Sequence, residues 1–432
     1  MVPVLVGNFV LMKHYHSMRH WVKLDPQEQQ TRISAALEHN IDFKHKTSLG
    51  IPASKLDSKV FYDQATFLKD APFLQAIVQN PNHIGCHTLG ESEHYFAGTQ
   101  AIEREVIRML SEDIFNAEEN ACDGYIASGG TEANIQAVWM YRNLFRNEYN
   151  ARPEEILLLA SDDTHYSVAK AANLLQIKHR SVPVAMNDRH IDHTALEAIV
   201  AQEKSQGIKY VIVIANMGTT MFGSIDNPDN YARVLAQSEL HFKIHMDGAF
   251  GGFIYPLVDG EHNVGFKNPN VSSITLDAHK MLQAPYGTGV FLARKGLINN
   301  VYTREAQYVN GMDITLCGSR SGANAIAVWM ILKTYGPYGW LEKLNTLLYR
   351  TDRCCYHLDL CGVRYYRHPK MNIITIRAED MPLSLAEEFG LVPDTHDGTA
   401  NWYKIVVMEH VEIEMLKDFT DKLEQYCLQN KK

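Results

Sequence analysis

The chain has 432 residues, of which 46% are hydrophobic and 21% charged, and its formal net charge is −9. This length and composition are typical of a globular protein with one large domain and a smaller one. A nucleic-acid partner is not expected, because phosphate binding draws on clustered Lys and Arg and the chain has no basic run.

The cysteines favour a reducing compartment. They are seven in number, hence odd, and only Cys354 and Cys355 are adjacent, which is a poor geometry for a disulfide. We therefore expect a cytoplasmic protein. Residues 1–12 are apolar, but they lack the features of a signal peptide and are too short to span a bilayer, so no membrane segment is expected.

Short apolar runs alternate with helical patterns from about residue 61 onward. Before them, residues 1–60 are expected to form an N-terminal arm with a helix-like stretch near residues 27–39. The alternation predicts buried parallel strands with helical crossovers, and so an α/β large domain over residues 61–322. The expected strands are residues 156–161, 210–215, 242–247, 274–276 and 290–294.

The pattern changes after residue 322. A long helix over about residues 323–335 is expected to link the large domain to a small C-terminal domain that ends at residue 432. Apolar runs predict strands in it near residues 373–377 and 403–408. A helix over about residues 412–428 is expected to close this domain.

A glycine-rich segment begins one of the expected helices. Residues 128–134 read Ser-Gly-Gly-Thr-Glu-Ala-Asn, so glycines, a hydroxyl and backbone amides meet at a helix N-terminus, which is typical of an anion site. The alternative is a plain turn in which Thr131 caps the helix, and the segment alone does not decide between the two.

Two strand ends carry ionisable groups. Asp247 ends an expected strand and is followed by small residues, where a flat ligand could approach the backbone. Lys280 follows another strand among apolar residues, where an amine is more readily uncharged and nucleophilic. Taken singly, Asp247 would more often be a turn residue and Lys280 a solvated lysine. Their combination with the glycine-rich segment favours a site.

The ordered motifs resemble the group II pyridoxal-phosphate decarboxylases, the family of the histidine, aromatic amino-acid, tyrosine and glutamate decarboxylases. The resemblance covers about residues 80–330. It implies a fold-type I enzyme with a mostly parallel mixed sheet, helices on both faces and a small α+β C-terminal domain. The matching segments are residues 128–134, 164–170, 218–220, 247–249, 279–280 and 315–322.

The resemblance implies a role for each matched residue. Lys280 would bind pyridoxal 5′-phosphate as an imine, and Asp247 would keep the pyridine nitrogen protonated, so that the ring accepts electrons when carbon dioxide leaves. His165 would stack on one ring face, with Ala249 on the other. The alternative for His165 is a satisfied core histidine.

Further contacts follow from the same resemblance. Thr220 would meet the ring hydroxyl, and Tyr308, on an expected loop, would deliver the proton that completes the amine. The alternative for Tyr308 is an aromatic that only packs the loop. A homodimer with shared active sites is also implied. The phosphate contacts would be Gly130, Thr131, His279 and, from the neighbouring subunit, Ser319.

The substrate class stays open at this point. We expect decarboxylation of a free L-amino acid, with histidine or an aromatic amino acid favoured because the chain resembles the small microbial enzymes in size. Two alternatives are a carbon–carbon lyase of the sphingosine-phosphate-lyase type and an inactive binding protein descended from a decarboxylase. The intact set of Lys280, Asp247 and His165 argues against the second alternative.

Two features have no clear place in this scheme. Asp277 stands where the animal aromatic amino-acid decarboxylases have Asn, and a carboxylate near a phosphate is unfavourable. A group of histidines and a cysteine could be interpreted as a zinc site, but the glycines among them make a continuous helix improbable, and no metal is expected. That group is His83, Cys86, His87 and His94.

Overall fold

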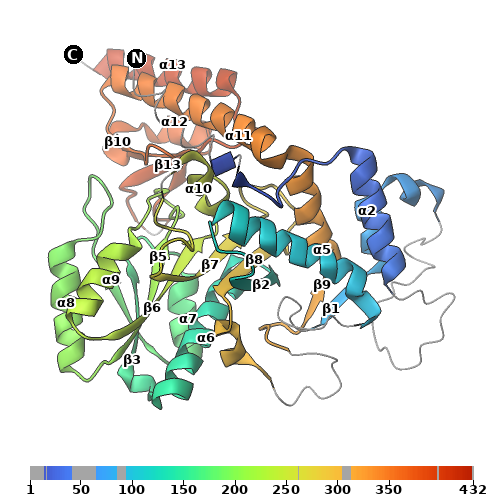
Figure 1. The fold of residues 1–432 in the computed structure, drawn as a ribbon. Helices are drawn as coiled ribbons and strands as arrows, with labels where there is room; N and C mark the ends of the chain where they lie inside the picture. The colour runs from blue at the N-terminus through green and yellow to red at the C-terminus, as the bar shows by residue number, and fades with distance from the viewer. Residues whose placement is uncertain are drawn as a thin grey trace.

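The computed structural model describes residues 14–15, 17–40, 65–84, 94–260, 262–303, 313–396 and 398–430. Its centre is a seven-stranded sheet with the order β2-β8-β7-β6-β5-β3-β4. Figure 1 shows helices on both sides of this sheet, with a separate C-terminal group of elements above it. The expected α/β class with a mixed sheet is therefore confirmed.

Five neighbouring strands of the sheet, β4, β3, β5, β6 and β7, run parallel, whereas β8 is antiparallel to both β7 and β2. The apolar runs predicted five of the seven strands. They did not predict β2, which contains Asp123 and Gly124, or β4, which is rich in polar residues. The strands are β2 (Cys122–Ala127), β3 (Ile156–Ser161), β4 (Lys178–Val182), β5 (Tyr210–Asn216), β6 (His241–Gly248), β7 (Val271–Asp277) and β8 (Gly289–Arg294).

The side chains of the central strands alternate between two hydrophobic cores. Leu157 and Val211 belong to one core, whereas their neighbours Leu158 and Ile212 belong to the other. A strand that is covered on both faces has a continuous apolar run in its sequence, and these strands show such runs. Helix α5 (Ala97–Arg108), α8 (His193–Ser205) and α9 (Pro228–Gln237) contribute to the first core, and α6 (Gly130–Tyr149) and α7 (Ser167–Leu175) to the second.

Helix α11 (Gly322–Cys361) leads to the C-terminal elements. The sequence predicted its end near residue 335, but the helical bonding continues past a kink where Gly336 has φ of 60° and Pro337 follows. The kink lies against Lys23, since a Cβ on Gly336 would come within 3.0 Å of the Lys23 backbone nitrogen. A long helix is thus bent around the N-terminal segment rather than ended.

An antiparallel sheet with the order β10-β11-β13-β12 forms the C-terminal unit. Its own core includes Leu358 of α11, Ile374 of β11 and Phe419 of α13. The elements are β10 (Tyr365–Tyr366), β11 (Ile373–Arg377), α12 (Leu383–Glu388), β12 (Val392–Pro393), β13 (Trp402–Val406) and α13 (Ile413–Asn430). The division of the chain after residues 60 and 322 stays a prediction.

The N-terminal helix α2 (Pro26–His39) lies beside α5 at one end of the molecule (Figure 1). Asp25 and Glu28 form a capping box at its start. Before it, the buried Trp21 donates from Nε1 to the Leu332 carbonyl of α11, 2.7 Å away. Helix α4 (Pro72–Gln79) lies nearby, as does a two-stranded ribbon formed by β1 (Asn82–Ile84) and β9 (Ser319–Ser321). A further short helix, α10 (Tyr255–Val258), lies near the C-terminal unit.

Among the helices that the structure describes, none combines the length and apolar character needed to cross a bilayer.

The contact between α2 and α5 leaves no room for a side chain at Gly98. A Cβ there would lie 2.0 Å from the Ala36 carbonyl oxygen, so Gly98→Ala should lower the free energy of unfolding by about 1–3 kcal/mol through overpacking. Gly339 is a helical control, because its nearest atoms, on Tyr335, are at an ordinary 3.7 Å. Gly339→Ala should leave stability unchanged or slightly higher. Denaturant unfolding of both variants measures this, and equal stability of the two would contradict the packing.

Candidate active site

A cavity with about 400 Å³ of open space lies at the C-terminal ends of β5, β6 and β7, beside the start of α6. Ligands of open α/β sheets bind at this edge. The strand register aligns Asn216, Asp247 and Thr275 across the three strands. Most of the predicted site residues border this cavity, namely Gly130, Thr131, His165, Thr220, Asp247, Ala249 and Lys280.

Asp247 carries a carboxylate that is almost fully buried, with 6% of the residue exposed. Its Oδ2 accepts a hydrogen bond from Asn134 Nδ2 at 2.8 Å, and its Oδ1 accepts one from the Ala249 amide at 3.1 Å. A buried charge is tolerated only where partners stabilise it. The two donors hold the Asp247 carboxylate at the cavity, where it can pair with a cationic group of a ligand.

Lys280 follows β7 and lies near a second carboxylate. Its Nζ is 3.7 Å from Asp277 Oδ2, and His279 Nδ1 is 2.8 Å from Asp277 Oδ1. Burial raises the pKa of Asp277, although the charges of Lys280 and His279 and the Gly130 amide oppose this. The carboxylate whose role the sequence left open thus lies between the Lys280 amine and the His279 imidazole.

His165 lies in the loop between β3 and α7 and borders the cavity. Its Nδ1 is 2.9 Å from Ser167 Oγ and 3.2 Å from the Ser167 amide nitrogen. Burial lowers the pKa of His165 below its usual value, although Asp247 opposes this. The ring is therefore uncharged at neutral pH and presents a flat face rather than a cation.

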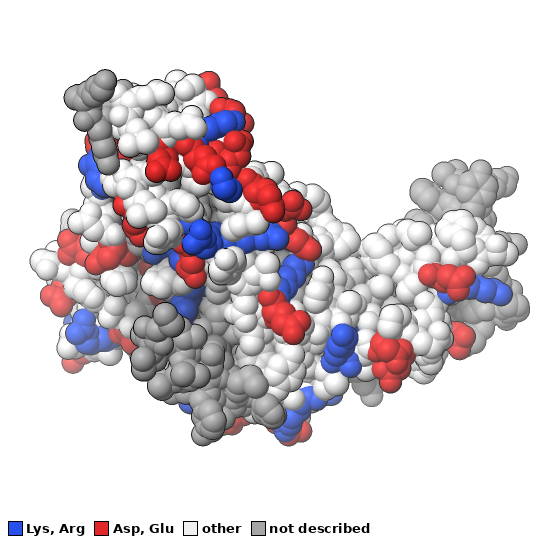
Figure 2. All heavy atoms as spheres, turned by 90° about the horizontal axis from the view of Figure 1, so that it is seen from above, with Lys and Arg blue, Asp and Glu red and all other residues white. Residues whose placement is uncertain are grey.

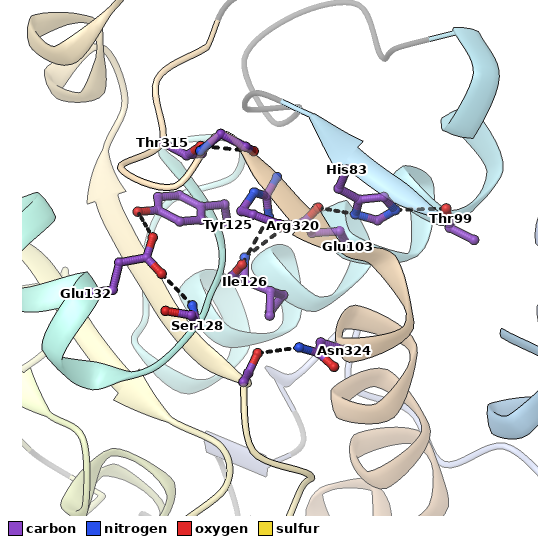
Figure 3. A network of polar contacts seen from close by, with 12 residues as sticks. His83, Thr99, Glu103, Tyr125, Ile126, Ser128, Glu132, Thr315, Arg320 and Asn324 are labelled. Atoms are coloured by element: carbon purple, nitrogen blue, oxygen red, sulfur yellow. Dashed lines mark hydrogen bonds and ion pairs between the residues drawn. The ribbon is translucent and has the colours of Figure 1, made fainter. Parts of the chain in front are cut away.

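The start of α6, where an anion site was expected, lies at the cavity. Gly130 and Thr131 are its first residues and border the cavity, and the first amides of a helix favour a negative group. The turn before them packs tightly on β8, since a Cβ on Gly289 would lie 2.5 Å from Gly129. Glu132 Oε2 accepts the Ser128 amide at 2.6 Å and holds this turn (Figure 3).

These groups fit a flat, anionic aldehyde with a basic ring nitrogen. The helix start suits its phosphate, the Asp247 carboxylate suits a protonated ring nitrogen, and the Lys280 amine suits a carbonyl carbon. All three border the same cavity.

Another buried carboxylate, Glu103 of α5, lies away from the cavity and ties the β1–β9 ribbon to the large sheet (Figure 3). It pairs with Arg320 of β9, and it accepts hydrogen bonds from the Ile126 amide at 2.7 Å and from His83 Nδ1 at 2.7 Å. His83 Nε2 contacts Thr99 Oγ1 at 2.8 Å. Burial alone would raise the pKa of Glu103, but Arg320 and His83 outweigh it and lower that pKa.

The remaining predicted residues lie elsewhere. Ser319 is exposed on β9, and His279 lies beside Asp277 with its ring 4.9 Å from that of Tyr286. Tyr308 lies outside the described residues. Of the histidine and cysteine group, His83 is bound to Glu103 and His94 is exposed, whereas Cys86 and His87 also lie outside the described residues. Within the described ranges, no cluster of three metal-ligating side chains occurs.

Sequence reasoning missed several residues around the cavity. Asn216 and Phe250 border it, and both adjoin motifs that were recognised, so extending each motif by a few residues would have found them. Asn134 was quoted in a motif without a role, although it bonds to Asp247. Glu103 carried no sequence signal, because its partners come from distant segments.

Comparison with known families gives a match to the pyridoxal-dependent decarboxylase conserved domain over residues 82–353. The chain is 50% identical to the tryptophan decarboxylase of Clostridium sporogenes, over 95% of this chain and 98% of that protein. It is 31% identical to the histidine decarboxylase of Vibrio campbellii, over 69% of this chain and 74% of that one.

A solved structure shares the fold. The sphingosine-1-phosphate lyase of Burkholderia pseudomallei superposes with a TM-score of 0.68 at 18% identity, covering 87% of this chain and 84% of that one. At this identity the likeness concerns the fold alone.

Proposed function

Because the chain belongs to the pyridoxal-dependent decarboxylase family, with pyridoxal phosphate as cofactor, we propose that it converts an aromatic L-amino acid into its amine and carbon dioxide. Tryptophan is the first candidate. The choice of tryptophan as substrate rests on the 50% identity to a tryptophan decarboxylase over nearly the whole of both chains. Histidine comes next, on the 31% identity to a histidine decarboxylase.

We assign the roles around the cofactor as follows. Lys280 attaches it covalently, and the buried Asp247 holds a proton at its ring nitrogen. His165 and Ala249 cover the two ring faces and exclude water, and Thr220 meets the ring hydroxyl. When bound, the protonated ring accepts the electron pair that departing carbon dioxide leaves on the α-carbon. The phosphate is held by Gly130, Thr131 and His279, with Ser319 of the neighbouring subunit.

Tyr308 is the proposed proton donor. Loss of carbon dioxide leaves the α-carbon one proton short of the amine, so a donor must reach it in a site closed to water. A phenol on a closing loop meets both needs, because it can donate the proton and cover the opening. This assignment rests on the family resemblance of the segment around Tyr308.

We also propose a homodimer in the cytoplasm. Exposed apolar residues gather on the short helix η1 (Thr66–Asp70) and on α4, namely Phe67, Leu74 and Ile77. On the face shown in Figure 2, acidic and basic side chains intermingle over the C-terminal helices. Exposed apolar patches of this kind suit a subunit interface.

Each described cysteine is a free thiol, which suits a reducing compartment such as the cytoplasm.

The substrate assignment is tested by supplying the purified holoenzyme with each common L-amino acid and measuring carbon dioxide together with the amine. Tryptophan should give the highest kcat/KM, with the other aromatic amino acids behind it. A clear preference for histidine would move the assignment to the second candidate. Carbon dioxide from none of the amino acids would reject the proposed function.

Lys280→Ala should remove both turnover and the visible absorption band of the bound cofactor, because the amine that attaches it is gone. Lys404→Ala is the matched control. Lys404 Nζ lies near the cavity, where it donates to the Thr220 carbonyl at 3.0 Å, and this variant should keep the band. A band that persists in Lys280→Ala and is reduced by borohydride would place the attachment on another amine.

Shared active sites are tested by mixing two inactive variants, Lys280→Ala and Tyr308→Phe. If Tyr308 acts across the interface, one of the two sites in a mixed dimer carries neither change, and up to about half of the activity per dimer should return. The measurement is amine formation by mixed dimers isolated with two different affinity tags. Mixed dimers that stay inactive would contradict the sharing of Tyr308.

A further inference from the structure

Asn134 lies between two groups that border the cavity, Asp247 and His165. It belongs to the first turns of α6, and only 1% of it is exposed. Its Nδ2 donates to Asp247 Oδ2 at 2.8 Å and to Ser167 Oγ at 3.0 Å. A single side-chain amide therefore uses one hydrogen on Asp247, which lines the cavity, and the other on Ser167, which contacts His165.

The orientation of this amide is determined by its surroundings. An ionised carboxylate only accepts hydrogen bonds, so Nδ2 of Asn134 must face Asp247. Its Oδ1 then faces His245 Nε2 at 3.1 Å, and Thr275 Oγ1 lies 2.9 Å from the same nitrogen. An amide oxygen only accepts, so a proton on His245 Nε2 satisfies Asn134 Oδ1, and the Thr275 hydroxyl can accept from it as well. Ser273 Oγ, 2.6 Å from His245 Nδ1, donates to that nitrogen. Burial lowers the pKa of His245 to about 3, which keeps the ring neutral in this tautomer.

The second branch leads through Ser167 to His165. Ser167 Oγ accepts from Asn134, so its own hydrogen is free to donate to His165 Nδ1 at 2.9 Å. The Ser167 amide, 3.2 Å from the same nitrogen, can only donate. His165 Nδ1 therefore carries no proton. The neutral ring has its proton on Nε2, and its angle is set by Ser167.

We propose that Asn134 is a positioning residue, which orients the Asp247 carboxylate toward the ring nitrogen of the cofactor and, through Ser167, sets the plane of the His165 ring above it. This rests on the proposed function only in placing the cofactor between Asp247 and His165. Asn134 itself need not touch the substrate.

The physical reason lies in the two oxygens of Asp247. Each accepts one donor, Asn134 on Oδ2 and the Ala249 amide on Oδ1, so the carboxylate cannot rotate freely. Donors to a carboxylate also favour its charged form. Without Asn134 the carboxylate loses one donor and its fixed plane, and the proton that it shares with the ring nitrogen is held less firmly on the ring.

The test uses Asn134→Ala with Asn143→Ala as control. Asn143 is the same residue type on the same helix, and it donates to the Asn300 carbonyl at 3.0 Å, away from the cavity. Each protein is loaded with pyridoxal phosphate labelled with ¹⁵N at the ring. Asn134→Ala should move the ring ¹⁵N signal toward the unprotonated position and weaken cofactor binding about tenfold or more, as expected for a lost hydrogen bond to a charged group. Asn143→Ala should match the wild type in both.

Two changes at His245 keep the test decisive if Asn134→Ala does not fold. His245→Leu removes the donor to Asn134 without touching Asp247, and His245→Gln retains an amide donor at that place. The ¹⁵N signal should shift in His245→Leu and return toward the wild type in His245→Gln. Unchanged signals and affinities in Asn134→Ala and His245→Leu would overturn the proposal.

The readouts need no amino acid. A wild-type protein that binds the cofactor and decarboxylates nothing would reject the proposed function, yet the ring ¹⁵N signal would still report on Asn134. Conversely, a normal decarboxylase with an unshifted signal in Asn134→Ala would reject only the positioning role.

Discussion

The burial of a negative charge at Asp247 is the constraint that the surrounding site must satisfy. A carboxylate taken out of water is stable only where donors replace the lost hydration. Asn134 and the Ala249 amide supply those donors, and Asn134 in turn needs His245 to satisfy its carbonyl oxygen. A chain of hydrogen bonds thus starts at this one charge and passes through Asn134 and His245 to Ser273.

The sheet brings the reactive groups to one edge. Its central strands are parallel and covered by helices on both faces, so their carboxyl ends open together at a single place beside the start of α6. Asp247, Asp277 and the Gly218 turn lie at these ends because each directly terminates or follows a strand. The helix start adds its amides at the same edge.

The buried Glu103 obeys the same rule in a different place. Arg320, His83 and the Ile126 amide surround its carboxylate, so the β1–β9 ribbon, α5 and β2 are joined through one charge (Figure 3). Removing one partner of such a group leaves a buried charge without compensation. Ser319, the residue expected to contact the phosphate of a neighbouring subunit, directly precedes Arg320, and Arg320 holds β9 in place through Glu103.

The sequence by itself determined the fold class, the family and the short segments that border the cavity. It could do so because strand ends, helix starts and glycine turns are local features, written in contiguous residues such as those around Asp247 and Lys280. Only the tertiary structure decided which of these groups touch. Asn134 and His245 are 111 residues apart, and Glu103 and Arg320 are 217 apart. Such pairings depend on the register of strands and the packing of helices across the sheet, which no local pattern encodes.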